Sequence, residues 1–265
     1  MDDLAALRLQ IEWGADEALE DAPVDRLRAA PPPPPIIPPP PIIPPPLAGG
    51  GQGEGSRATP AARALEIAAA AQTLADLRAA ITAFDGCALR DTASNLVFAE
   101  GNPSAGLLLI GDAPGADDDR SGLPFAGPAG AYLDRMLASI ALRRSDLLLT
   151  ALIPWRPPGD RPPSPAELAI CLPFLTRLIA LAAPRRLVLL GPLALRALAA
   201  PPSRRRTRGA WLDLAITGLD RPLPALPTFS PTELMRSPRD RRAAWADLRL
   251  LRRTLDADSS ESDST

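Results

Sequence analysis

Four short stretches rich in large apolar residues separate longer segments in which apolar residues recur at helical spacing. A run of this kind, bounded by a turn, is typical of a strand covered on both faces, as in a parallel sheet. Segments 131–140 and 193–198 repeat apolar residues three and four positions apart, which predicts helices between the strands. The sequence therefore predicts an α/β fold of three layers, α/β/α, around a central, mainly parallel four-stranded sheet. The four expected strands are 107–111, 147–153, 186–191 and 226–229.

The first 60 residues differ in composition from the rest of the chain. Residues 3–19 place leucine and isoleucine on one face of a short amphipathic helix. Residues 31–46 alternate proline runs with Ile-Ile pairs, which predicts an extended spacer, and a glycine-rich stretch follows. One Ala-rich helix is expected over 61–84. We therefore expect a helical segment (1–28), a Pro/Gly-rich linker (29–60), one folded domain (61–255) and an acidic, disordered tail (256–265).

Glycine and proline gather in the loops that follow the expected strands. Gly111-Asp-Ala-Pro-Gly115 follows the first strand, and its continuation 122–130 leads into a helix. A helix N-terminus presents unpaired N–H groups that bind anions, typically phosphate. Because the carboxyl ends of parallel strands share one edge of a sheet, we expect these loops to line one cleft. The other two segments of this kind are 155–161 and 227–236.

The pentapeptide 111–115 alone leaves two interpretations open, a binding loop and a plain strand-to-loop turn. It lacks the G-x-G-x-x-G spacing of a dinucleotide-binding loop. It is no P-loop either, because that motif requires a lysine and the chain contains none.

Two absences restrict the chemistry. The chain has no histidine, which excludes Ser-His triads and His-liganded metals, and without lysine it cannot form a Schiff base. Cys87 and Cys171 lie far apart in sequence and form no C-x-x-C pair. We find no signal peptide and no apolar run long enough to span a bilayer, so we expect a cytoplasmic protein with reduced thiols and no membrane association.

The charge of the chain is unevenly distributed. The net charge is only −2, but residues 185–253 carry 15 Arg against 5 acidic residues, whereas both ends of the chain are acidic. A basic region of this kind suits phosphate binding. A compositional bias that replaces every lysine by arginine is the alternative explanation, and it accounts less well for the clustering.

Taken together, Gly111–Gly115, Leu123–Gly130, Trp155–Arg161 and Pro227–Arg236 resemble the family 4 (type-4) uracil-DNA glycosylases in order and spacing. The resemblance covers roughly residues 74–255. It implies a monofunctional N-glycosyl hydrolase of base excision repair, which flips uracil or another deaminated base out of DNA and hydrolyses its glycosidic bond. The implied partner is uracil-containing DNA, single- or double-stranded, and we expect a monomer.

The resemblance also implies roles for individual residues. Phe125 would stack on the base, Asp112 would position water, and Ser230 would stabilise the departing base. The base-binding pocket would be formed by Gly111, Ala113, Pro114, Gly115, Phe125 and Ala151, and DNA phosphates would be held by Arg156, Arg161 and Arg236.

This chain departs from the family pattern at chemically important positions. Asp112 replaces a glutamate, Ala151 an asparagine that reads the uracil edge, and Ser230 a histidine donor; Asp160 also replaces an asparagine. We therefore expect weakened activity. The alternative is a catalytically silent relative that only binds DNA, in which Arg156, Arg161, Arg236 and the arginines of segment 204–208 would hold phosphates. A solvated surface turn is the other interpretation of segment 204–208.

The family's four-cysteine iron–sulfur cluster is also affected. Phe84 and Trp155 stand where two of the cysteines would be, and Cys87 and Cys171 match the other two. Two thiolates cannot hold a cluster that needs four. We therefore predict no metal centre and no other cofactor, with Phe84 and Trp155 buried in the core.

Overall fold

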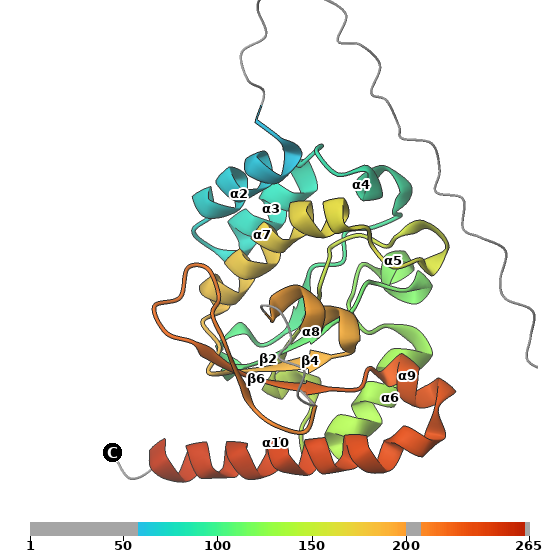
Figure 1. Ribbon diagram of the computed structural model, residues 1–265, viewed down its shortest axis with the longest axis vertical. Coiled ribbons are helices and arrows are strands. Elements are labelled where there is room, and N and C mark those ends of the chain that lie inside the picture. Colours follow the sequence, from blue (N-terminus) through green and yellow to red (C-terminus); the bar gives the residue numbers. More distant parts are fainter. Residues whose placement is uncertain (1–57, 200–207, 263–265) are drawn as a thin grey trace, which may run out of the picture. The chain divides into compact units, whose positions relative to one another are not determined.

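The computed structural model describes residues 58–199 and 208–262 (Figure 1). All of these residues belong to one compact unit. The predicted N-terminal helix, nearly all of the predicted linker and arginines 204–206 lie outside the described residues.

One six-stranded sheet crosses the molecule in the order β1-β3-β2-β4-β6-β5. Its four central strands run parallel and correspond to the four expected strands, although β6 begins three residues earlier than expected; the α/β prediction is confirmed. The prediction of only four strands needs correction, because two three-residue strands pair antiparallel at the edges and make the sheet mixed. The strands are β1 (Ala99–Gly101), β2 (Leu107–Gly111), β3 (Leu148–Ala151), β4 (Arg186–Leu190), β5 (Leu212–Leu214) and β6 (Leu223–Thr228).

Helices cover both faces of the sheet because successive strand residues point to opposite sides. In β2, Leu108 and Ile110 pack into the core under α2, α3 and α7, whereas Leu107 and Leu109 pack into the core beside α6, α9 and α10. Figure 1 shows these two layers on either side of the strands. The layer helices are α2 (Pro60–Ala70), α3 (Leu74–Ala83), α7 (Pro165–Ala182), α6 (Gly127–Ala138), α9 (Pro231–Arg236) and α10 (Arg241–Ser262).

Short helices occupy the loops between these layers. They are α4 (Ala88–Thr92), α5 (Ala116–Ser121) and α8 (Pro192–Leu198), with 3-10 turns η1 (Pro103–Ala105), η2 (Arg144–Asp146), η3 (Pro158–Asp160) and η4 (Pro238–Asp240).

Two helix boundaries differ from those expected. The helix expected over 61–84 is two helices, because the hydroxyl of Thr73 accepts from the backbone N–H of Asp76 and the Asp76 carboxylate accepts from that of Thr73. This reciprocal capping starts a new helix. At the other end, α10 continues to Ser262, so most of the expected disordered tail 256–265 is helical.

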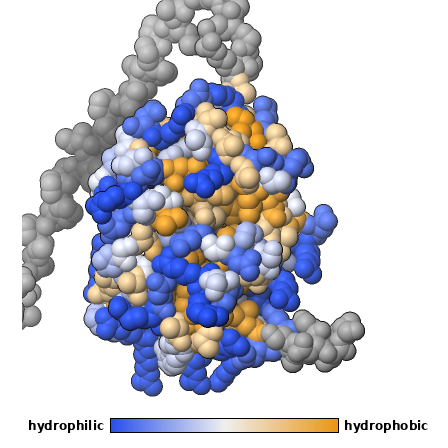
Figure 2. Space-filling view, turned by 180° about the vertical axis from the view of Figure 1, so that it is seen from behind, coloured by the Kyte–Doolittle hydropathy of each residue, from blue (hydrophilic) through white to orange (hydrophobic). Residues whose placement is uncertain are grey.

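Helix α7 also corrects the statement that no apolar run could span a bilayer. Its 18 residues have a mean hydropathy of 1.6, which meets the requirement by length and composition. The helix packs against α2 and α3 and contributes Cys171, Phe174 and Leu178 to the core. On the face shown in Figure 2, hydrophilic side chains are spread among smaller apolar patches.

Candidate active site

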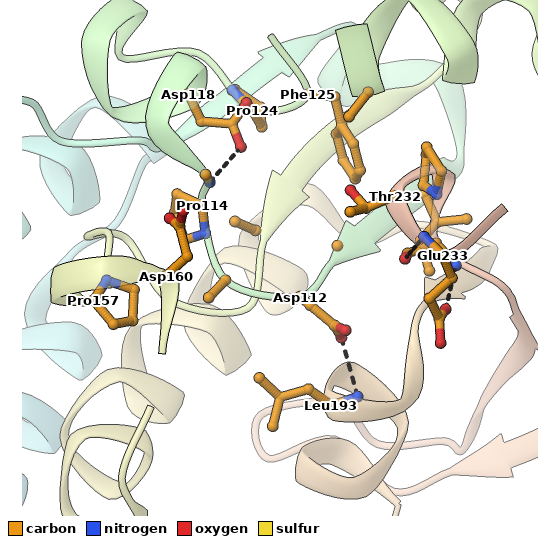
Figure 3. A pocket seen from close by; sticks show the side chains of 18 of the residues that line it. Asp112, Pro114, Asp118, Pro124, Phe125, Pro157, Asp160, Leu193, Thr232 and Glu233 are labelled. Carbon is orange, nitrogen blue, oxygen red and sulfur yellow. Dashed lines mark hydrogen bonds between the residues drawn. The ribbon is translucent and has the colours of Figure 1, made fainter. Parts of the chain in front are cut away.

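A cleft with a cavity volume of about 490 Å³ opens where the four parallel strands end. It brings together loops that are more than 100 residues apart in sequence (Figure 3). Arg156 is the one predicted site residue that does not line it. The predicted residues that do are Gly111, Asp112, Ala113, Pro114, Gly115, Phe125, Ala151, Arg161, Ser230 and Arg236.

Asp112 extends from the end of β2 to the start of α8. Its Oδ1 accepts hydrogen bonds from the backbone N–H groups of Leu193, at 3.1 Å, and Ala194, at 2.9 Å. Burial raises the pKa of this carboxyl to about 6, and the charge of nearby Glu233 acts in the same direction. Asp112 is therefore mostly ionised at neutral pH, and one of its oxygens already accepts hydrogen bonds from the backbone.

The Phe125 ring lies against the end of β2. A Cβ atom at Gly111 would be 2.5 Å from Cζ of this ring, so only glycine leaves room for it. The ring is half-buried and lines the cleft. An aromatic face in this position can stack on a planar base.

Ser230 begins helix α9. Its Oγ accepts from the backbone N–H of Glu233 at 3.1 Å, and the Glu233 carboxylate accepts from the backbone N–H of Ser230 at 2.8 Å. The hydroxyl proton of Ser230 takes no part in these bonds. The residue therefore combines a capping role with one free donor at the cleft.

Ala151 ends β3 at the wall of the cleft. Its methyl group offers no hydrogen bond, so nothing at this position reads a base edge. Where the family pattern places an amide, this chain has only a small apolar surface.

The three arginines predicted to hold phosphates differ in their surroundings. Arg156 pairs with Asp160 at 2.7 Å, and Arg161 makes two bonds to Glu167, at 2.6 and 2.9 Å. Arg236 is exposed, lines the cleft and makes no ion pair within the described residues.

Sequence reasoning missed four charged residues of the cleft: Asp117, Asp118, Arg196 and Glu233. The pattern Ser230-Pro-Thr-Glu233 is a capping-box signature and could have placed Glu233 at a helix start. Arg196 is an exposed residue of α8. No local sequence pattern places it in the cleft, because the position of α8 beside the cleft depends on the order of the strands in the sheet.

The residues at the family's cluster positions do not fit an iron–sulfur group. Phe84 and Trp155 are buried, and the Phe84 ring meets that of Phe174 edge-on with centroids 5.2 Å apart. The interaction with Cys87, together with burial, raises the pKa of the Cys171 thiol. Within the described part of the chain, no group of three or more His, Cys, Asp or Glu side chains could hold a metal ion.

The fold and the cleft define an α/β protein with a binding site at the carboxyl ends of its parallel strands. The family model described as the uracil DNA glycosylase superfamily matches residues 98–249. The chain belongs to this superfamily and is similar to its type-4 members.

Three relatives illustrate this similarity. The type-4 uracil-DNA glycosylase of Pyrobaculum aerophilum is 34% identical over 58% of this chain and 80% of its own. That of Saccharolobus solfataricus is 32% identical, over 64% of this chain and 80% of its own. That of Thermotoga maritima is 33% identical, over 57% of this chain and 77% of its own.

Proposed function

We propose that the chain is a monofunctional DNA glycosylase that excises uracil, or another deaminated base, from single- or double-stranded DNA, with weakened activity. The observation that carries this proposal is the cleft, in which the Phe125 ring, the Asp112 carboxylate and the Ser230 hydroxyl line one cavity. We further propose that it acts as a monomer in the cytoplasm and without a cofactor.

The chemistry follows from these groups. A flipped base costs a few kcal/mol to unstack, and the face of Phe125 compensates part of that cost. Breaking the glycosidic bond leaves positive charge on the sugar and negative charge on the base. The ionised Asp112 holds the attacking water and stabilises the sugar, while the hydroxyl of Ser230 donates to an oxygen of the departing base.

Two changed polar groups account for the weakened activity. Ala151 cannot bind the base edge, and Ser230 is a weaker donor than a cationic histidine. Removing one such donor outright typically costs ~2.7–4 kcal/mol, so the loss at Ala151 sets the minimum cost and the weaker donor at Ser230 adds to it.

The alternative is a protein that binds DNA without cleaving it. One observation favours it: Asp112 and Ser230 both hydrogen-bond the backbone at the starts of helices, which is a structural role.

The deciding experiment measures uracil excision from a labelled single-stranded oligonucleotide, and binding to the same strand. Wild type is compared with Asp112→Asn, whose Oδ1 can still accept both N–H groups of α8, and with Asp112→Ala, which removes the contact. Excision by wild type that is lost in both variants, with binding retained, supports catalysis by the carboxylate. Binding without excision in wild type supports the alternative.

A gain-of-function pair tests the cause of the weakness. Ala151→Asn combined with Ser230→His restores the family's two polar groups, and we expect excision to rise at least tenfold. Ser230→His also removes the cap of α9, at about 1 kcal/mol of stability. Ser230→Ala, which loses the same cap without adding a donor, is the matched control. No gain in the double variant would mean that other parts of the site are also missing.

A further inference from the structure

The backbone of Phe125 is held in an unusual conformation. Its φ angle is +55°, a left-handed value that costs a bulky residue free energy unless the surroundings impose it. Contacts on both sides of Phe125 impose this conformation. Two of the groups involved, Arg144 and Asp118, lie outside the sequence motifs of the cleft.

Arg144, in η2, holds the carbonyl side. Its guanidinium donates to the Phe125 carbonyl at 2.7 Å and to the Pro124 carbonyl at 3.5 Å. The same group pairs with Glu100 of β1 and with Asp134 of α6, each at 2.7 Å. Burial opposes the charge of Arg144, but its ion pairs with Asp134 and Glu100 outweigh it and raise the pKa. The arginine is therefore fixed from three directions.

Asp118 holds the other side. Its Oδ1 accepts from the backbone N–H of Ala126 at 2.6 Å, and its Oδ2 accepts from that of Gly115 at 2.9 Å (Figure 3). This carboxylate ties the Phe125 segment to the loop after β2. Gly130 completes the arrangement, because a Cβ atom there would lie 1.7 Å from the Phe125 carbonyl oxygen.

We propose that Arg144 is a positioning residue for base binding, which fixes the Phe125 ring against Gly111 through the Phe125 carbonyl. The inference rests on the proposed function, in which this ring stacks on the flipped base. A planar guanidinium can donate to two carboxylates and to a carbonyl at the same time. A lysine ammonium, as a compact charge on a flexible stem, cannot reproduce that geometry.

The first test needs no activity. The chain contains five phenylalanines, so protein labelled with 4-fluorophenylalanine gives five ¹⁹F resonances, and Phe125→Leu assigns one of them. In Arg144→Met and Arg144→Lys we expect the Phe125 resonance to shift or broaden while the other four stay in place. Arg143→Met is the matched control, because its side chain is 83% exposed and its one ion pair among the described residues is with Asp146. A Phe125 resonance unchanged in both Arg144 variants would overturn the proposal.

The second test uses excision kinetics. Loss of ring alignment weakens base binding, so we expect KM to rise about tenfold in both Arg144 variants, with little change in Arg143→Met. A purely structural role would only reduce the folded fraction, which lowers the apparent kcat and leaves KM unchanged; that result would contradict the proposal. If Arg144→Met fails to fold, the ¹⁹F spectra and the excision kinetics are measured on Arg144→Lys and Glu100→Gln instead. Absence of excision in wild type would reject the proposed function, and the ¹⁹F result would still decide the positioning role.

Discussion

At the scale of single residues, the polar groups of the cleft also support the backbone around it. The carboxylate of Asp112 binds the start of α8, some 80 positions further along the chain. From the sequence, this carboxylate could be placed directly after a strand. Its hydrogen-bond partners at the start of α8 could not be predicted, because they depend on which strands are neighbours in the sheet. Ala151 and Ser230 could be placed in the cleft through the family resemblance, because Ala151 lies at the end of one recognisable strand and Ser230 shortly after another.

The raised pKa of Asp112 leads to a specific prediction for how stability depends on pH. Its pKa is raised from 3.8 to about 6, so the folded protein binds this proton more tightly than the unfolded chain does. The contribution of Asp112 to the free energy of unfolding therefore falls as pH rises from 4 to 6, by about 2 kcal/mol. Asp112→Asn lacks this titration and should gain stability relative to wild type across that window.

Urea denaturation of both proteins at pH 4 and pH 7 measures the difference. Asp118→Asn is a useful comparison, because burial also raises the pKa of that carboxyl while its partners lie in other loops. A wild-type to Asp112→Asn difference that is the same at both pH values would show that Asp112 titrates as in the unfolded chain.

At the scale of elements, burial decided what could be predicted. The central strands are covered on both faces, so their runs of leucine and isoleucine are visible in the sequence. The edge strands β1 and β5 have only three residues each, too few for a periodic pattern. The break between α2 and α3 occurs in an Ala-rich stretch whose helical propensity continues across it, and only Thr73 and Asp76 mark the new start.

The contact between α10 and β6 predicts that substitutions of two paired residues, Arg208 and Asp247, lower stability by different amounts. Asp247 is 3% exposed and accepts from the Thr228 hydroxyl at 2.8 Å and from Arg208 at 3.1 Å. The Arg208 guanidinium also lies 4.3 Å from the Phe229 ring centroid, next to Ser230. Removing the arginine takes from a buried carboxylate the counter-ion that it has among the described residues, which is costly. We expect Arg208→Gln to lower stability by about 2 kcal/mol, and Asp247→Asn by less.

Thermal unfolding of the two variants and of the double variant tests this order. The double variant should be closer to Asp247→Asn than to the sum of both losses, because the removed groups are partners. Equal and additive losses would mean that Arg208 and Asp247 do not depend on one another.

At the scale of the whole molecule, the positions where the family pattern places a metal cluster are part of a packed apolar core in this chain. Cys87, Cys171, Phe84 and Trp155 all belong to one core cluster. We predict that the protein purified without oxygen contains no iron and shows no visible charge-transfer band.

The double variant Phe84→Cys with Trp155→Cys supplies four cysteines, and each truncation lowers stability by about 3–5 kcal/mol. Stoichiometric iron in wild type would contradict the prediction, and iron uptake only by the double variant would confirm that the two native cysteines are placed as ligands.

The distribution of charge around the cleft gives a prediction for DNA binding. Arg196 and Arg236 line the cleft, are exposed and form no ion pair in the described ranges, so they can bind phosphates without breaking other contacts. Neutralising each should lower the slope of log affinity against log salt by about 0.7 for a single strand. Arg161 must give up Glu167 before it binds a phosphate, so Arg161→Gln should change the slope less. Arg78→Gln, on α3 and away from the cleft lining, is the control; a slope that falls equally in all four variants would show that DNA responds to net charge rather than to this cleft.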